Sequence, residues 1–565
     1  MSIYKIGKVI GVSGDKIDVS LIDYNADGEA PGVPETMAVN IDTGSGPFPL
    51  IIGQPGSFIK VSIPTGTLLC LITDIQMKEN SVSVSETKEA ISDGQFPIAS
   101  PKRIVSAIPI GTIDLSGKFE RGTDILPTIN SDVYAVLPKT IEDVYKSYAE
   151  GDFSIGRLSL IPEQDAKFNL DAFLTRHAAI LGQTGCGKSW TVASFMQKLS
   201  TFKKSTIVLF DLHNEYKSAF GDDIDYINAS DIELPYWLMN CEELLGLMVD
   251  RAESHAPNQI AKFKELLQTA KEMHPENTTM GIPKITVDTP VYFDFNSIVN
   301  EFARLDIEMI PGATKPKQGP LYGQFTRLLM RLESRLNDKR YDLIFHPKTY
   351  NTSASMEHLF RKILGEESKP KKAVVIDISP IPFDVRTSVI SLLMRCLFDF
   401  AYWYKRINKA SYPIAVFCDE AHIYLNEREP STLPARESAE RIAKEGRKYG
   451  ISLTVISQRP REVSATILSQ CNTFLCLRIT NPDDQSYVKS LLPESIKGII
   501  NMVSTLRRGE GILLGDSIMM PTRIRITPPN PKPTSDDTSF SKEWSKDHEE
   551  VDLNTVLNSW RRQDA

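Results

Sequence analysis

Apolar and polar positions alternate in short segments over the first 150 residues. Examples are 16–21, 57–63, 68–75 and 81–84, and turn residues such as Ser13-Gly14-Asp15 separate them. Several short strands at this spacing predict a small β-barrel or sandwich. Because no catalytic constellation is visible in this region, we interpret 1–150 as a domain for assembly or partner docking.

From His177 onward, continuous apolar runs alternate with helical patterns. The runs cover 178–181, 206–210, 373–376, 414–418, 452–456 and 473–477. Runs of this kind with helices between them are typical of a parallel sheet that is covered on both faces. We therefore expect an α/β core formed by 151–228 and 371–527.

The segment 229–370 interrupts this core. It is charged and mostly helical by pattern, for example over 260–267, and segments containing Gly and Pro break it at 281–284 and 311–320. This predicts an inserted helical domain. After Thr527, four prolines in seven residues predict an extended strap, and the tail to residue 565 is polar with one possible helix at 553–560.

Composition and charge narrow the possible classes of protein. Hydrophobic residues make up 41% and charged residues 24%, which excludes a wholly disordered or collagen-like chain. The net charge of −8 excludes a globally basic nucleic-acid coat but not a local basic pore. The seven cysteines include no CxxC spacing. The most apolar stretch, 389–404, is interrupted by Arg395 and Asp399, so we expect a core helix, no membrane span and a cytoplasmic location.

One motif carries specific chemistry. GQTGCGKS matches GxxxxGK[ST] at every fixed position, after an apolar strand and before a helix. Its residues are Gly182, Gln183, Thr184, Gly185, Cys186, Gly187, Lys188 and Ser189. The glycines let backbone N–H groups turn toward phosphates, Lys188 reaches the β and γ phosphates, and the Ser189 hydroxyl ligates Mg²⁺. A chance match in a glycine-rich loop is the alternative.

Two adjacent acids follow the apolar run 414–418. In a parallel sheet they would lie at the edge that carries the phosphate loop. We expect Asp419 to hold Mg²⁺ through its water shell and Glu420 to orient and deprotonate the attacking water. The alternative is that the pair only caps the following helix.

Two further strand ends carry polar groups. Asp211 and Glu215 follow the run 206–210, where they would support the metal and the water, or serve only as a loop cap and an ion-pair partner. Gln458 follows the run 452–456 and is a candidate sensor of the γ phosphate, with a surface turn before Pro460 as the alternative.

A charged helix is predicted between these strands, over 437–449, with Gly450 as its carboxyl-terminal stop. Glu437–Arg441 and Glu440–Lys444 are favourable i,i+4 pairs, which indicates a solvated helix. However, Arg441 and Arg447 are also candidates for an arginine that is supplied to a neighbouring subunit's site.

Taken together, these motifs resemble the HerA family of hexameric DNA-translocating ATPases, within the HerA/FtsK group of RecA-like motors. The stretches that carry the resemblance are IGKVIGVSGDKIDVSL (6–21), RHAAILGQTGCGKSWTVA (176–193), IVLFDLHNEY (207–216), VVIDIS (374–379), AVFCDEAH (415–422), RIAKEGRKYGISLTVISQRP (441–460) and PTRIRI (521–526). The EGRKYG…SQRP block is the most specific. Cys186 departs from the serine or alanine that is common at its position.

The resemblance implies a RecA-like P-loop NTPase core with an amino-terminal β-barrel and a helical insertion. It also implies a homo-hexamer that hydrolyses ATP with Mg²⁺ between subunits around double-stranded DNA. Arg447 becomes the leading candidate for the trans arginine, with Arg441 second. A nuclease or a sirtuin-like effector is the expected partner on the barrel face, in DNA end processing or antiphage defence.

Two other functions stay open at this point. The chain could be an FtsK-like or conjugative DNA pump, although such pumps commonly carry membrane spans. It could also be a nucleotide-switched scaffold ring that regulates an immune effector with little DNA translocation. DNA-stimulated ATP hydrolysis would distinguish the motor from the scaffold.

Overall fold

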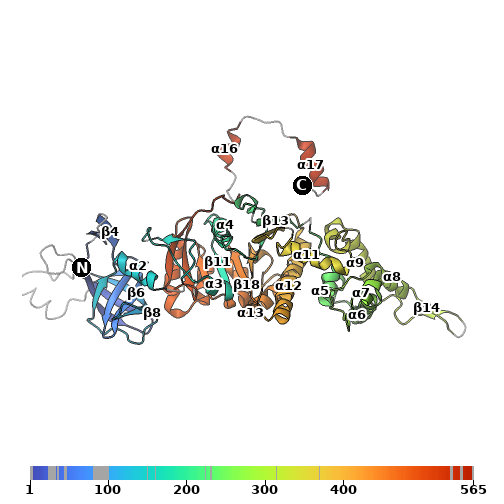
Figure 1. Ribbon diagram of the computed structural model, residues 1–565, viewed down its shortest axis with the longest axis horizontal. Coiled ribbons are helices and arrows are strands. Elements are labelled where there is room, and N and C mark those ends of the chain that lie inside the picture. Colours follow the sequence, from blue (N-terminus) through green and yellow to red (C-terminus); the bar gives the residue numbers. More distant parts are fainter. Residues whose placement is uncertain are drawn as a thin grey trace, which may run out of the picture.

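The computed structural model describes residues 4–22, 33–34, 37–42, 47–79, 101–148, 151–159, 161–222, 224–229, 232–312, 315–367, 369–534, 539–546 and 552–562. The chain is elongated. An amino-terminal barrel lies at one end, an α/β sheet in the middle, and a group of helices at the other end (Figure 1). The strand expected over 81–84 lies outside the described residues.

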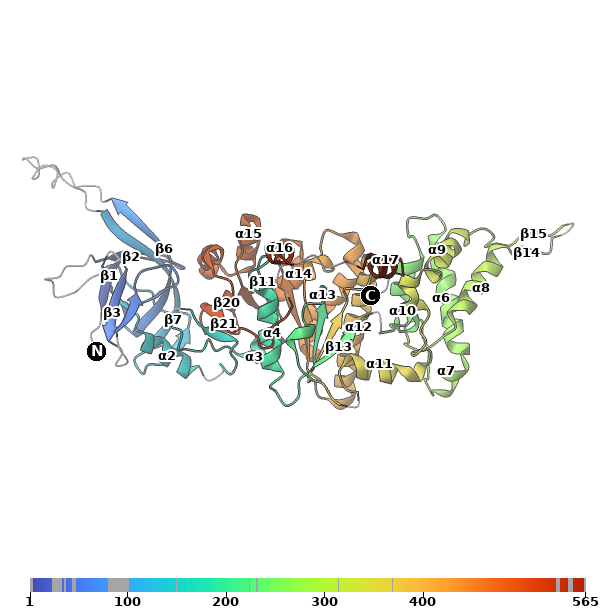
Figure 2. The same ribbon diagram turned by 90° about the horizontal axis from the view of Figure 1, so that it is seen from above.

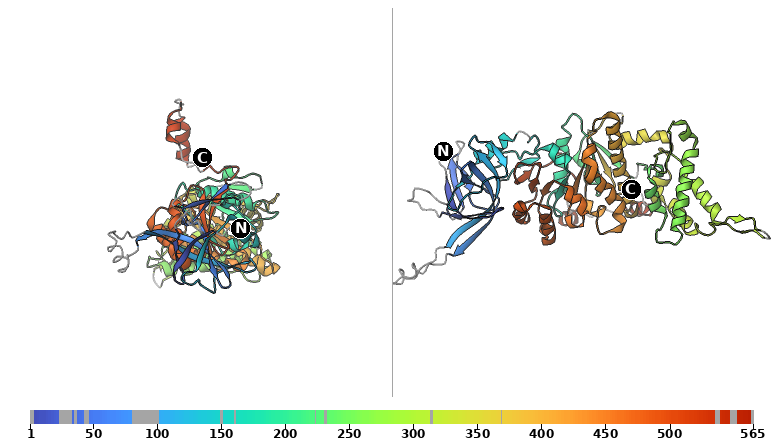
Figure 3. Two further views of the ribbon diagram at one scale, coloured as in Figure 1. Left: turned by 90° about the vertical axis from the view of Figure 1, so that its left-hand side faces the viewer. Right: turned by 90° about the horizontal axis from the view of Figure 1, so that it is seen from below.

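The amino-terminal domain is a closed antiparallel barrel. Its strands follow the order β2-β1-β9-β5-β6-β7, pairing of β2 with β7 closes it, and β8 lies outside on β7. The strands are β1 (Lys5–Val12), β2 (Ile17–Leu21), β5 (Phe58–Ile63), β6 (Gly66–Glu79), β7 (Pro101–Asp114), β8 (Phe119–Arg121) and β9 (Asp132–Ala135). Alternate residues of each strand fill the interior, as the burial of Ile17, Val19 and Leu21 in β2 shows. The predicted barrel is thus confirmed, and β6 and β7 extend beyond the rest of it (Figures 2 and 3).

The middle of the molecule is a 10-stranded sheet in the order β10-β21-β20-β19-β11-β18-β17-β12-β16-β13. The strands from β19 to β13 are parallel, which confirms the predicted α/β core, whereas β20, β21 and β10 are antiparallel. Their bounds are β10 (Gly156–Leu158), β11 (Ala178–Leu181), β12 (Ile207–Asp211), β13 (Ile224–Asn228), β16 (Ala373–Asp377), β17 (Ile414–Cys418), β18 (Ile451–Ser457), β19 (Thr473–Cys476), β20 (Glu510–Gly515) and β21 (Thr522–Ile526).

Helices cover both faces of this sheet. The connection from β11 to β12 through α4 (Lys188–Leu199) runs across the sheet in one direction. The connections through α12 (Phe383–Asn408) and α13 (Leu433–Tyr449) run in the opposite direction. Because such crossovers are right-handed, α4 lies on one face and α12 and α13 on the other (Figure 1).

Helices α5–α11 lie between β13 and β16 and form the far end of the molecule (Figure 2). They are α5 (Cys241–Met248), α6 (Ala256–Met273), α7 (Pro275–Thr279), α8 (Phe295–Asp306), α9 (Thr326–Leu336), α10 (Asp342–Phe345) and α11 (Met356–Ile363). Their apolar faces meet in an aromatic core, in which the rings of Phe302 and Phe325 are 4.8 Å apart. One apolar cluster continues from this core into the central sheet.

The carboxyl-terminal part begins with the proline-rich strap after β21. It ends in α16 (Phe540–Trp544) and α17 (Leu553–Arg562), neither of which buries any residue. The described part of the chain contains no helix with the length and apolarity that a membrane crossing requires.

Candidate active site

The phosphate loop connects β11 to α4 and shows why its glycines are needed. Gly185 and Gly187 have φ of 74° and 104°, in the left-handed region that glycine adopts without strain. A Cβ at Gly182 would lie 2.7 Å from both Cys186 Sγ and Leu477 Cβ. The N–H groups of Gly182 and Gln183 donate to Ser457 O (3.1 Å) and Arg478 O (2.9 Å), which ties the loop to the ends of β18 and β19.

Lys188 begins helix α4 directly after this loop. Only 7% of its side chain is exposed, and its Nζ lies 3.6 Å from Glu420 Oε1 and 3.5 Å from Gln183 O. The ammonium therefore lies between the phosphate loop and the acid at the end of β17.

Glu215 approaches the same loop from β12. The Ser189 hydroxyl donates to Glu215 Oε2 at 2.5 Å. Asp211 shapes the turn that carries Glu215, because its carboxylate accepts from the N–H groups of His213 (3.1 Å), Glu215 (3.3 Å) and Tyr216 (3.2 Å). Asp211 thus caps a turn, and Glu215 reaches the predicted metal ligand itself.

The acids at the end of β17 adopt an unusual conformation. Glu420 has φ of 44°, which is strained for a residue other than glycine. In a continuing strand, Asp419 and Glu420 would point to opposite faces. The left-handed turn breaks that alternation, and Asp419 Oδ1 accepts from the Glu420 N–H at 3.0 Å. Both carboxylates can then act on the Lys188 side of the sheet edge.

The electrostatics of this cluster are dominated by burial. Burial raises the pKa of Asp419 well above its ordinary value, and repulsion from Glu420, Asp211 and Glu215 adds to that. Burial also raises the pKa of Glu420, while Lys188 acts in the opposite direction. Glu420 Oε2 is buried and has no hydrogen-bond partner among the described residues. The cluster is therefore short of positive charge and of hydrogen-bond donors.

Gln458 follows β18, beside the phosphate loop, and accepts a short hydrogen bond from the Thr184 hydroxyl. The neighbouring loop residue, Gln183, accepts from the Thr480 hydroxyl (2.5 Å) and N–H (3.1 Å). A polar cavity of about 430 Å³ adjoins both pairs and is lined by Arg459 and Arg461 as well. The structure therefore brings Gln458 into contact with the phosphate loop.

The two candidate trans arginines lie away from the chain's own phosphate loop. Arg447 is exposed and lines a cavity of about 670 Å³ with Thr206, Ile414 and Ile451, at the amino ends of β12, β17 and β18. The loop lies at the carboxyl ends of these strands. A seven-residue strand such as β18 separates the two edges by roughly 20 Å.

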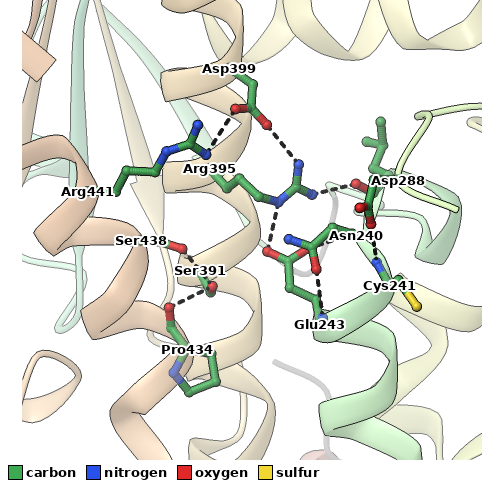
Figure 4. Close-up of polar contacts among 11 residues, drawn as sticks. Asn240, Cys241, Glu243, Asp288, Ser391, Arg395, Asp399, Pro434, Ser438 and Arg441 are labelled. Carbon is green, nitrogen blue, oxygen red and sulfur yellow. Dashed lines mark hydrogen bonds and ion pairs between the residues drawn. The ribbon is translucent and has the colours of Figure 1, made fainter. Parts of the chain in front are cut away.

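Arg441 is bound within its own chain. Its guanidinium lies 4.2 Å from the centroid of the Phe398 ring, and its Nη1 is 3.4 Å from Asp399 Oδ1. Asp399 also pairs with Arg395 at 3.1 Å, and Arg395 pairs with Glu243 of α5 at 2.8 Å (Figure 4). These contacts connect α13, α12 and the inserted helices.

Sequence reasoning missed three groups that touch the site. The Tyr216 hydroxyl donates to Asp419 Oδ2 at 3.1 Å, and His422 Nδ1 lies 3.3 Å from Glu420 Oε2. Burial lowers the pKa of His422 to about 4, so it is neutral near pH 7. Tyr216 and His422 are the last residues of the motifs IVLFDLHNEY and AVFCDEAH, and their place in these motifs could have indicated that they belong to the site. Thr480 carried no signal, because only the folded sheet brings it to Gln183.

The described residues contain no group of three or more His, Cys, Asp or Glu side chains arranged to hold a metal ion by themselves. All seven cysteines are buried and unpaired.

Comparison with known proteins agrees with the motifs. A family model described as the central domain of the helicase HerA matches residues 153–397. The match therefore ends before Asp419. A DNA double-strand break repair helicase HerA of Sulfurisphaera tokodaii is 26% identical over 79% of this chain and 82% of its own length. The HerA of Pyrococcus furiosus is 27% identical over 74% and 77%.

Two solved structures were also similar. VirB4 of Thermoanaerobacter pseudethanolicus has a TM-score of 0.46 at 16% identity and covers 67% of this chain and 96% of its own. The plasmid coupling protein TrwB has a TM-score of 0.43 at 13% identity, over 68% and 93%. The chain is therefore similar to HerA helicases along most of its length, and the phosphate loop between β11 and α4 identifies it as a P-loop ATPase.

Proposed function

We propose that this ATPase is a DNA translocase or helicase that works as a ring of six subunits and hydrolyses ATP at the contacts between them. The observation that carries the proposal is the approach of Lys188 to Glu420, at 3.6 Å, between the phosphate loop and the end of β17. The relatives named DNA double-strand break repair helicase HerA supply the task on DNA.

The residues of one subunit would act on ATP as follows. The N–H groups of the loop and the amino end of α4 bind the phosphates, and Lys188 contacts the β and γ oxygens. Glu420 accepts the proton of the attacking water, a role that its raised pKa supports because a stronger base accepts protons more readily. Gln458 exchanges its hydrogen bond with Thr184 for one with the γ phosphate or the water.

The residues present fit a magnesium ion. Ser189 and Asp419 would hold it, and a divalent cation would offset the burial and the repulsion between carboxylates that raise the pKa of Asp419. When bound, Mg²⁺ neutralises charge on the β and γ phosphates. Glu215 now accepts a hydrogen bond from the Ser189 hydroxyl and would instead hydrogen-bond the water shell of the ion. Asp211 would keep Glu215 in place through the turn that it caps.

The catalytic arginine would come from the neighbouring subunit. Arg447 is the better candidate, since it is exposed at the opposite edge of the sheet, where it cannot reach the loop of its own chain. Arg441 is the weaker candidate because Asp399 and Phe398 hold its guanidinium. A trans arginine of this kind is worth on the order of 10³–10⁵ in rate.

We further propose double-stranded DNA as the substrate of movement, and a nuclease or sirtuin-like effector as a partner on the barrel, in DNA end processing or antiphage defence. DNA contacts would be made to phosphates and would weaken with salt. The position of the barrel at the end of the molecule, away from the inserted helices, leaves it accessible to such a partner (Figure 1).

The test is ATP hydrolysis by the full chain with and without duplex DNA, together with an assay of DNA movement. A motor is stimulated by DNA and moves along it, and Lys188→Ala abolishes both activities. The matched control is Lys198→Ala, an exposed lysine at the other end of α4. Slow hydrolysis that ignores DNA would contradict the motor and favour the nucleotide-switched scaffold.

A further inference from the structure

Trp190 lies directly after the phosphate loop, in the first turn of α4, and the proposed chemistry does not use it. Two cations lie over its indole ring. The Arg508 guanidinium is 5.6 Å and the Lys532 ammonium 5.1 Å from the ring. The indole Nε1 is buried and has no hydrogen-bond partner among the described residues. An aromatic ring flanked by cations beside a phosphate loop is suited to bind a nucleoside and its first phosphate.

The geometry of the loop gives the direction in which a nucleotide would lie. Glu420 and Gln458 contact Lys188 and Thr184, so this flank is the γ-phosphate end. The other flank, at Cys186 and Gly187, packs against the turn before β20, where the Gly509 N–H donates to Cys186 O at 3.0 Å. Arg508 immediately precedes Gly509. The nucleoside therefore leaves the loop on the side of Arg508 and Trp190.

The proline-rich strap covers the same side. The Asn530 N–H donates to Gln197 Oε1 at 2.9 Å, and Gln197 Nε2 donates back to Pro531 O at 2.8 Å. Farther along, the Ser218 hydroxyl donates to Lys532 O at 2.9 Å, and the Thr534 N–H donates to Glu215 O at 2.8 Å. These bonds hold Lys532 over α4 and join the strap to the residue that contacts Ser189.

We propose that Trp190, Arg508 and Lys532 form the nucleoside end of the nucleotide site, with the carboxyl-terminal strap as one of its walls. The base packs against the indole, and the two cations face the ribose and the α phosphate. This inference rests on the proposed function, since it requires that the loop binds a nucleoside triphosphate. It makes the strap part of the nucleotide site instead of a passive tail.

The test compares two probes by calorimetry on the full chain with Mg²⁺: a non-hydrolysable ATP analogue and inorganic tripolyphosphate, which lacks the nucleoside. Trp190→Leu weakens the analogue roughly 5- to 150-fold, the range for loss of a base–aromatic stack, and leaves tripolyphosphate unchanged. Lys532→Ala weakens the analogue about 2- to 5-fold. The matched control Trp403→Leu removes an exposed indole of α12 and changes neither affinity.

A second measurement protects the test against a misfolded variant. Addition of the analogue to the wild-type chain changes its tryptophan emission, tripolyphosphate does not, and Trp190→Phe abolishes the change while it retains most of the affinity. The inference is overturned if Trp190→Leu binds the analogue as tightly as wild type, or if it loses both probes equally. A wild-type chain that binds neither probe would contradict the proposed function as well.

Discussion

The ion pair between Lys188 and Glu420 makes a prediction about stability that requires no nucleotide. Lys188→Met removes the ammonium and keeps the apolar stem of the side chain. Glu420, of which 12% is exposed, then loses the nearby cation that lowers its pKa and remains beside Asp419. At 3.6 Å and an effective dielectric constant of about 20, the lost attraction is about 4–5 kcal/mol.

Protonation of Glu420 limits this cost. Protonating a glutamate with an ordinary pKa of about 4.3 costs roughly 3–4 kcal/mol at pH 7, and about 1.4 kcal/mol less for each unit that the pH falls. With Lys188 gone, the folded pKa of Glu420 rises further above its unfolded value, so the folded state binds more protons and loses stability as the pH rises. Because the midpoint shift falls as the unfolding unit grows, and this chain has 565 residues, the unfolding midpoint at pH 7 should fall by roughly 3–5 °C.

The assay is differential scanning calorimetry of the nucleotide-free chain at pH 6, 7 and 8. Glu420→Gln removes the charge that needs Lys188, so the double variant should be more stable than Lys188→Met alone. Lys198→Met, the same substitution at an exposed position of α4, is the control and should stay near wild type. Equal midpoints for Lys188→Met and wild type at all three pH values, or a double variant no more stable than Lys188→Met, would refute the reasoning.

Arg447→Ala should lose ATP turnover at least 10³-fold, and mixing it with Lys188→Ala subunits should restore part of the activity; unchanged turnover in Arg447→Ala alone would exclude the trans role. Thr184→Val removes the hydrogen bond that the Thr184 hydroxyl donates to Gln458 in the nucleotide-free chain. It should therefore change KM more than kcat, whereas Gln458→Ala should lower kcat; the same kinetic effect from both would contradict the sensor role. Burial lowers the pKa of His177 to about 4, so acidification from pH 6.5 toward 4 should remove up to about 3 kcal/mol of wild-type stability. His177→Asn should lack that part of the acid loss in denaturant titrations, and an identical pH profile would contradict it.

The parts of the site that could be predicted are those that local pattern determines. The phosphate loop needs only its own glycines and the strand and helix around it. Asp419 and Gln458 could be assigned to one edge because neighbouring parallel strands have their carboxyl ends at the same edge of the sheet. The structure places β11, β18 and β17 side by side in this way. The amino-terminal barrel followed in the same way from alternation in short segments.

Features that depend on long-range contacts could not be predicted. Nothing in the sequence indicated that β20, β21 and β10 extend the sheet as antiparallel strands. The left-handed turn at Glu420 is set by the fold, since glutamate alone does not favour a φ of 44°. Trp190 receives its cations from positions 508 and 532, more than 300 residues along the chain.

The balance of charge around Lys188 gives a physical reason why a neighbouring subunit would complete the site. The carboxylates of Asp211, Glu215, Asp419 and Glu420 lie close together around Lys188, and burial raises the pKa of Asp211, Asp419 and Glu420. A bound triphosphate adds several more negative charges. The loop N–H groups and the amino end of α4 contribute only about half a positive charge. Mg²⁺ contributes two, and Arg508 and Lys532 lie at the nucleoside end of the site. At the γ-phosphate end, Arg441 is already paired and Arg447 lies at the far edge, so a cation from a neighbouring chain would supply the charge that this end lacks. Nucleotide affinity should therefore rise with assembly of the subunits, and an affinity that is independent of protein concentration would contradict this argument.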